Sequence, residues 1–423
     1  MKKEIKNALL KESYFEYTLS NGLTVLIYPM KDKKGTFALL GAKIGSATGD
    51  FILNGEKVVV PAGVAHFLEH KLFENENEDA FTLFAKTGAN ANAYTSFDRT
   101  CYLFGASENE MESLRILISF VSSPHFTDAT VEKEQGIIGQ EIKMYDDSAE
   151  WVLFMTVLRC LYSEIPLKDD IAGSVETIAK ITPKTLYDCY NAFYRPENMV
   201  LSIAGNIDSD EVIRVCEEEY AKIEYKKQNV ETIDCKEPKE IAKAEETSRM
   251  SIFEKQFCLG YKETPHKECD RVKNDLVEKL ILDIIAGETS ELYRELYDKG
   301  LVNGLFETSD LSDSDYLCFT FSGESKDPEY VVKRIKEEIK RIKKDGLNDE
   351  LFNEAKRAMI GSIMCGFDNS ETVASNMLNC HFKHCGIYDI IDVASSITRL
   401  DAEGLLAEIL CPERSALVIV EPQ

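Results

Sequence analysis

Positive charge is scarce in this sequence of 423 residues. It has 49 Lys and Arg against 74 Asp and Glu, which gives a formal net charge of −25. Nucleic-acid backbones and anionic membrane surfaces repel such a protein, so we expect neither as a partner. Long apolar runs are also missing, because no stretch reaches the roughly 18 residues of a membrane-spanning helix. The charged start Met1-Lys-Lys-Glu-Ile-Lys does not resemble a secretory signal, which favours a cytoplasmic location.

Paired cysteine motifs are absent as well. The 12 Cys are scattered without a C-x-x-C pair, so we expect reduced structural thiols rather than a disulfide framework. One dense tract, Cys380-His-Phe-Lys-His-Cys385, holds four soft donors. Adjacent Cys and His on a helix point in different directions and do not readily close a tetrahedron, so we favour a buried or interfacial helix there over a metal site.

Histidine is rare, and two of the six His lie in Val64-Ala-His-Phe-Leu-Glu-His-Lys-Leu-Phe73. As a helix, this stretch places His66 and His70 on one face at i and i+4, with Glu69 beside them. Two imidazoles at this spacing can share a tetrahedral zinc ion, while the carboxylate can reach a metal-bound water without being a ligand. The order H-x-x-E-H is the inverzincin signature. The competing interpretation is a solvated helix that carries two His by chance.

A catalytic zinc ion with three protein ligands needs a third donor elsewhere in the chain. Residues 127–145 predict a second helix that begins at Thr127 or Asp128. On it, Glu134 and Glu141 share a face because they lie two helical turns apart. A carboxylate on a largely apolar face is costly to bury unless it is paired or bound to a metal. Spacing alone does not rank one of these residues above the other as a ligand.

Several segments together resemble the pitrilysin family of zinc metallopeptidases, which includes insulin-degrading enzyme and mitochondrial processing peptidase. They are His66-Phe-Leu-Glu-His70, Glu132-Lys-Glu-Gln-Gly-Ile-Ile-Gly-Gln-Glu141, Gly88-Ala-Asn-Ala-Asn-Ala-Tyr-Thr95, Tyr194-Arg-Pro-Glu-Asn-Met199 and Leu19-Ser-Asn-Gly-Leu-Thr-Val25. The resemblance covers most of the first half of the chain and the second half in outline.

By position, the resemblance implies that His66, His70 and Glu141 bind one Zn²⁺ per chain. It also implies that Glu69 is the general base and that Glu134 is a second acid supporting the site. The expected activity is that of a zinc metalloendopeptidase. It would hydrolyse peptide bonds in short or unfolded polypeptides through a zinc-bound water. The alternative is a catalytically silent, zinc-binding scaffold subunit of a processing complex.

The stretch Ala93–Phe104 predicts one strand from its Tyr, Thr and Phe content. In the family, this strand lies at a sheet edge facing the zinc ion and takes an extended substrate as an additional strand. Asn92 and Ala93 match family residues that contact substrate. With the neighbouring Tyr94, they are the predicted substrate-binding residues. The alternative is an ordinary central strand that follows a glycine-containing loop.

The mixture of strands and helices has no βαβ regularity, which indicates an α+β fold. We expect two tandem homologous domains, each a mostly antiparallel sheet covered by helices: residues 1–228 with zinc, a linker at 229–248, and a metal-free copy at 249–423. The stretch ending at Gly361 parallels the stretch ending at Gly139, an offset of 361 − 139 = 222. In that register Ile363 takes the place of Glu141, and no His occupies the metal helix.

One departure from the family concerns substrate binding by the second domain. Related chains often carry an Arg and a Tyr in a segment that resembles residues 290–303. Here Tyr297 and Asn303 occupy those positions. We therefore expect a heterodimer with a related metal-free chain that supplies the missing pair, or a homodimer.

Overall fold

The computed structural model describes residues 2–76 and 78–423. The chain forms two compact units, and each is assembled from segments that are distant in sequence. Unit 1 contains residues up to Ile142, Asp169–Asp234 and Cys365–Tyr388. Unit 2 contains Lys143–Lys168, Cys235–Met364 and Asp389–Gln423.

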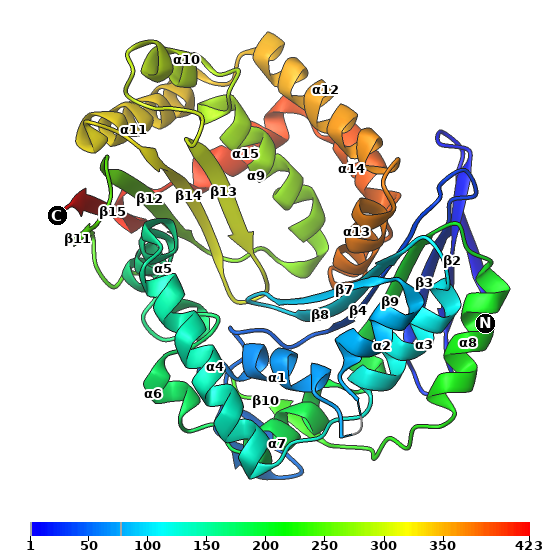
Figure 1. Cartoon of the computed structure of the whole chain (residues 1–423). Coiled ribbons are helices and arrows are strands. Elements are labelled where there is room, and N and C mark those ends of the chain that lie inside the picture. Colours follow the sequence, from blue (N-terminus) through cyan, green and yellow to red (C-terminus); the bar gives the residue numbers. More distant parts are fainter. Residues whose placement is uncertain (1, 77) are drawn as a thin grey trace. The chain divides into compact units, whose positions relative to one another are not determined.

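Unit 1 is built on a seven-stranded sheet in the order β1-β2-β3-β9-β4-β8-β7. The strands are β1 (Lys3–Asn7), β2 (Glu12–Thr18), β3 (Thr24–Pro29), β4 (Thr36–Ala42), β7 (Asn90–Thr95), β8 (Thr100–Ala106) and β9 (Met199–Gly205) (Figure 1). Only β3 and β9 pair in parallel. A small second sheet joins β10 (Val230–Thr232), β5 (Phe51–Leu53) and β6 (Glu56–Val58).

The helices of unit 1 come from all three of its segments. They are α1 (Val64–Phe73), α2 (Ala80–Thr87), α3 (Glu110–Val121), α4 (Asp128–Asp146), α6 (Val175–Ile178), α7 (Pro183–Phe193), α8 (Ser209–Tyr220) and α13 (Ser370–Phe382), with a 3-10 turn at Pro196–Asn198. The central strand β9 is buried along its whole length, as its apolar sequence predicts for a strand covered on both faces.

Unit 2 is built on a five-stranded sheet in the order β11-β15-β12-β14-β13. Its strands are β11 (Glu245–Met250), β12 (Gln256–Glu263), β13 (Glu307–Ser312), β14 (Leu317–Glu324) and β15 (Ser415–Pro422). Its helices are α5 (Ala149–Leu161), α9 (Arg271–Ala286), α10 (Glu291–Asp298), α11 (Pro328–Asp345), α12 (Asp349–Gly366), α14 (Asp389–Ser396) and α15 (Arg399–Glu408), with 3-10 turns at Pro166–Lys168, Glu268–Asp270 and Pro412–Arg414.

The two sheets repeat one topology. Five strands of the large sheet in unit 1 are, in chain order, β3, β4, β7, β8 and β9. Across the sheet they lie in the order β3-β9-β4-β8-β7, so the first strand of this set is followed by the fifth, second, fourth and third. The strands β11 to β15 follow the same order in unit 2, and in both sheets only the first and fifth strands are parallel. The prediction of an α+β fold with a duplicated, mostly antiparallel sheet is confirmed. The counterpart of α1 is α9, which contains no His.

Each sheet is covered on one face by a helix from the other half of the sequence. Helix α13 packs on β9 and β4 of unit 1, and the hydroxyl of Ser202 donates to the backbone oxygen of Ala374 at 2.7 Å. Helix α5 packs on β12 and β15 of unit 2. Next to it, the Tyr162 hydroxyl donates to the backbone oxygen of Leu317 at 2.9 Å. Each compact unit is therefore discontinuous in sequence. The predicted homologous domains, 1–228 and 249–423, are each continuous in sequence, and they stay a prediction.

One local expectation needs correction. The single strand expected at Ala93–Phe104 is a hairpin of β7 and β8, because the chain turns at residues 96–99 and the backbone N–H of Ser96 donates to the oxygen of Arg99 at 2.8 Å. The residues predicted as a linker, 229–248, contain β10, which pairs with β5, and the start of β11; the linker itself stays a prediction. No helix within residues 2–76 and 78–423 combines the length and apolar character needed to cross a bilayer.

Candidate metal centre

Helix α1 carries the H-x-x-E-H motif and is held by the core of unit 1. Val64, Phe67, Leu68 and Leu72 are almost fully buried, so the face that carries them faces the core. Gly63 at the N-cap has φ +93°, and a Cβ added there would lie 2.5 Å from the backbone oxygen of Ala172. The helix begins where only glycine fits, and this fixes the position of the His-bearing face.

The structure brings His66, His70 and Glu141 together. One ligand atom from each residue lies within 4.8 Å of the others. Nε2 of His66 is 3.6 Å from Oε1 of Glu141, and Nε2 of His70 is 3.4 Å from Oε2 of the same carboxylate. Among the described residues, no other group of His, Cys, Asp or Glu meets this criterion, so the Cys380–Cys385 tract does not form a second one.

These separations fit a zinc ion. A tetrahedron with Zn–N and Zn–O bonds of about 2.0–2.1 Å has corners about 3.3–3.4 Å apart. The two measured nitrogen–oxygen distances are close to that value, so the three atoms can bind one ion after small adjustments. Two imidazoles and one carboxylate are also the ligand set of known catalytic zinc sites that keep a fourth position open.

The two His differ in their electrostatic surroundings. Burial, together with the nearby His70, lowers the pKa of His66 to about 3, which keeps its imidazole neutral and able to bind a metal. Burial also lowers the pKa of His70, but the hydrogen bond to Glu134 and the negative charges of Glu134, Glu141 and Glu69 together hold this pKa above its ordinary value. Nδ1 of His70 lies 2.9 Å from Oε1 of Glu134, which is itself almost buried.

Glu69 lies beside the trio but is not part of it. Its Oε2 accepts a hydrogen bond of 2.5 Å from the hydroxyl of Thr95 on β7. Burial raises the pKa of Glu69, while the hydrogen bond from Thr95 and the charge of His70 act in the opposite direction. Thr95 ends the Gly88–Thr95 motif, but its residue type and position in the sequence do not mark it as part of the site.

Strand β7 forms an open edge of the large sheet, because it pairs with β8 alone. In an antiparallel pair of strands, hydrogen-bonded residue pairs alternate with pairs that are not hydrogen-bonded to each other. The hydrogen bond between Ser96 and Arg99 shows which pairs of β7 and β8 are of each kind. Tyr94 and Asn92 therefore pair with β8, and Ala93 turns its backbone N–H and C=O toward the open edge. The N–H of Ala93 donates to the side-chain oxygen of Asn92 at 2.9 Å. Of the three predicted substrate-binding residues, Ala93 thus presents backbone groups and Asn92 covers one of them.

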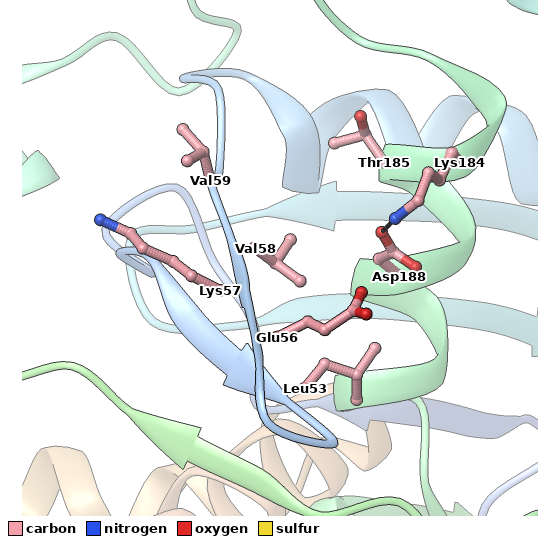
Figure 2. A pocket seen from close by; sticks show the side chains of 8 residues that line it. All are labelled: Leu53, Glu56, Lys57, Val58, Val59, Lys184, Thr185 and Asp188. Carbon is pink, nitrogen blue, oxygen red and sulfur yellow. Dashed lines mark hydrogen bonds and ion pairs between the residues drawn. The ribbon is translucent and has the colours of Figure 1, made fainter.

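A different hollow in unit 1 contains none of the predicted site residues. It has a volume of about 190 Å³ and is lined by Leu53, Glu56, Lys57, Val58, Val59, Lys184, Thr185 and Asp188 (Figure 2). Lys184 and Asp188 lie one turn apart on α7, on one side of this hollow, and form an ion pair of 2.5 Å. It is smaller than the roughly 300–1,000 Å³ of typical small-molecule sites.

Comparisons with known proteins agree with the geometry. The sequence pattern described as Insulinase (Peptidase family M16) matches residues 60–175, and the one described as Peptidase M16 inactive domain matches residues 180–359. A Bacillus subtilis (strain 168) protein named "Uncharacterized zinc protease YmfH" is 35% identical over 428 residues and covers 100% of both chains. The chain belongs to peptidase family M16.

Other M16 proteins show how far the likeness extends. The "Probable mitochondrial-processing peptidase subunit beta" of Schizosaccharomyces pombe is 31% identical over 212 residues, which cover 49% of this chain and 45% of that protein. A solved structure described as an M16-like peptidase from Alicyclobacillus acidocaldarius superposes with a TM-score of 0.94 at 32% identity, over 97% of this chain and 98% of that one. A protease from Helicobacter pylori, at 20% identity and a TM-score of 0.84, shows the fold alone and covers 97% and 100%.

Proposed function

We propose that this chain is a zinc metalloendopeptidase that cleaves short or unfolded polypeptides. The observation that carries the proposal is the convergence of His66, His70 and Glu141 on one point while the neighbouring Glu69 stays outside that trio. Named relatives such as the zinc protease of Bacillus subtilis support the same reaction class.

Each residue has a role in the proposed reaction. His66, His70 and Glu141 would hold the ion, and Glu134 would accept the Nδ1 proton of His70 in a hydrogen bond and fix its tautomer. A bound Zn²⁺ supplies an activated water, with a pKa of about 7, and polarises a carbonyl. Glu69 would take the proton from that water and pass it to the leaving amine nitrogen.

Substrate binding is proposed at the open edge of β7. An extended peptide can pair there with the outward backbone groups of Ala93, and this pairing gives affinity without fixing side-chain identity. Asn92 would release the N–H of Ala93 when a peptide arrives and offer its amide to the substrate. Tyr94, which is partly exposed on this strand, completes the proposed contact surface.

The proposed assembly is a dimer. Tyr297 is more than half exposed on α10, and Asn303 donates from its side chain to Oε2 of Glu324 at 2.9 Å. Neither residue supplies the positive charge of the Arg that related chains often carry there. A heterodimer with a metal-free relative would provide it, and a homodimer would not.

The deciding experiment compares the wild-type protein with the Glu69→Gln variant. Both should bind one zinc ion per chain by elemental analysis, because Glu69 is not in the trio. Cleavage of a peptide library should fall by about a hundredfold to ten-thousandfold in the variant, the usual contribution of a general base. Chelation of the metal should abolish wild-type cleavage, and restored Zn²⁺ should recover it.

The same assay separates the alternative. The match of residues 180–359 to an inactive domain favours, as a second candidate, a silent zinc-binding scaffold. Zinc binding without cleavage by the wild-type protein, both alone and with a coexpressed metal-free relative, would support the scaffold. Cleavage that rises on coexpression would support the heterodimer, and full cleavage by a monomer would exclude it.

A further inference from the structure

The hydroxyl of Thr95 is the one hydrogen-bond partner that the described residues provide for the Glu69 side chain. The bond joins Thr95 Oγ1 to Glu69 Oε2 at 2.5 Å, a short distance typical of a hydroxyl that donates to a carboxylate. Among the described residues, no hydrogen bond reaches the other carboxylate oxygen, Oε1. The two oxygens of Glu69 therefore differ in their environment.

The position of Thr95 explains how this bond forms. Thr95 is the last residue of β7, and α1 packs against this strand. Along β7, Ala91, Ala93 and Thr95 are partly buried, whereas Asn90, Asn92 and Tyr94 alternate with them and are exposed. The side chain of Thr95 thus lies on the inward face of the strand, as the two-residue period of a strand requires.

Glu69 needs a restraint in this place. Glu69 directly precedes the proposed ligand His70 and has a carboxylate side chain, as Glu141 does. Its oxygens nevertheless lie outside the group of converging ligand atoms. A carboxylate is itself a zinc ligand and can therefore occupy a coordination position of a nearby ion. A catalytic zinc site works only while its fourth position is open to water or substrate.

We propose that Thr95 is a positioning residue for the proposed peptidase reaction. Its hydroxyl holds Oε2 of Glu69 away from the ligand trio and leaves Oε1 as the atom that accepts the proton of the water. Thr95 also lies on the strand proposed to pair with substrate, and the register turns its backbone N–H and C=O toward the open edge. Pairing of a peptide with β7 would therefore fix the backbone that carries this hydroxyl.

The test is Thr95→Val, which replaces the hydroxyl with a methyl group and keeps the branched shape that suits a strand. The inference rests on the proposed function, so wild type and Glu69→Gln are assayed beside it. For Thr95→Val we expect kcat to fall by about tenfold to a hundredfold, the usual cost of losing a supporting hydrogen bond at a metal site. KM should change by less than about threefold, because the peptide still pairs with the strand.

Metal measurements distinguish positioning from a general loss of structure. Zinc affinity of Thr95→Val should be equal to or higher than that of wild type, since Glu69 becomes free to bind the ion. The visible spectrum of the Co²⁺-substituted variant should change in shape as the ligand set changes. Thr95→Ser should restore wild-type kcat and spectrum, because it keeps the hydroxyl, whereas Thr95→Ala should not.

Thr36→Val on β4 is the matched control. Thr36 is 2% exposed in the same sheet, and its hydroxyl has no hydrogen-bond partner among the described residues, so the same chemical change should leave kcat and spectrum unaltered. An unchanged kcat in both Thr95→Val and Thr95→Ala, with Glu69→Gln inactive, would overturn the role of Thr95 and leave the peptidase intact. Absence of cleavage by wild type, both alone and with a coexpressed metal-free relative, would overturn both.

Discussion

At the scale of single residues, the metal site depends on the second nitrogen of His70. When Nε2 binds an ion, Nδ1 carries the proton and donates it to Glu134, 2.9 Å away. Glu134→Gln removes the negative charge that strengthens this bond. We expect zinc affinity to fall by about tenfold to a hundredfold, measured by competition with a chromophoric chelator.

Glu132→Gln on the same helix is the control for that change. Glu132 is exposed, so the loss of its charge should leave zinc affinity as it is in wild type. Equal affinities for the two variants would show that Glu134 does not support His70. The role of Glu134 was predictable only through the family resemblance, because the spacing of Glu134 and Glu141 alone does not distinguish a supporting acid from a metal ligand.

The role of Thr95 could not be predicted from the sequence for a related reason. Its hydrogen bond to Glu69 joins residues 26 positions apart on a helix and a strand. The sequence predicts α1 and one long strand that includes Thr95, but the approach of this strand to the helix is decided by packing. The i, i+4 relation of His66 and His70, by contrast, lies within one helix, where local geometry alone sets it.

At the scale of elements, the start of α1 fixes where the metal ligands lie. Gly63 combines a positive φ with contact to the Ala172 backbone, so Gly63→Ala both strains the chain and pushes the helix away. We expect a loss of about 2–3 kcal/mol in the free energy of unfolding, measured in urea, together with weaker zinc binding.

The Gly55→Ala variant separates the effect of backbone strain from the effect of displacing helix α1. Gly55 has φ +88° and nothing within 4 Å of an added Cβ, so it shares only the strain. Its cost should be about 1 kcal/mol, with zinc affinity unchanged. If both variants cost the same and bind zinc equally, the contact with Ala172 does not position α1.

Helices with strong local signals were predictable, and so were hairpins with clear turn residues. Asn-Gly is the favoured pair for a tight hairpin turn, and Asn21-Gly22 indeed lies between β2 and β3. The turn at residues 96–99 was missed because aromatic and β-branched residues continue on both sides of it and favour one long strand. Ser96 and Asp98 were the available turn signal, and they were outweighed by the neighbouring Tyr and Phe.

At the scale of the whole molecule, the exchange of α5 and α13 was not predictable. The apolar face of a helix shows that the helix packs against another part of the protein, but it does not show which of the two sheets the helix covers. The repeat at an offset of 222 predicted two copies of one plan, and the strand orders confirm it. A tandem repeat also predicts two units that are continuous in sequence, whereas the compact units exchange these equivalent helices.

This exchange has a consequence for stability. Val373, Met377 and Leu378 of α13 are almost fully buried in unit 1, and each contributes about 1.5–3 kcal/mol of apolar burial. Their sum of roughly 5–9 kcal/mol is comparable with the whole net stability of a domain, about 5–15 kcal/mol. The fragment 1–234 lacks α13, and the fragment 235–423 lacks α5, which covers β12 and β15.

We therefore predict that neither fragment folds alone. Each should show no cooperative transition in urea, and fragment 1–234 should bind zinc weakly although it contains all three proposed ligands. Coexpressed fragments should copurify, unfold cooperatively and bind one zinc ion per pair, because each then supplies the helix that the other lacks. A monomeric fragment 1–234 that unfolds cooperatively and binds zinc as tightly as the intact chain would show that α13 is dispensable for unit 1.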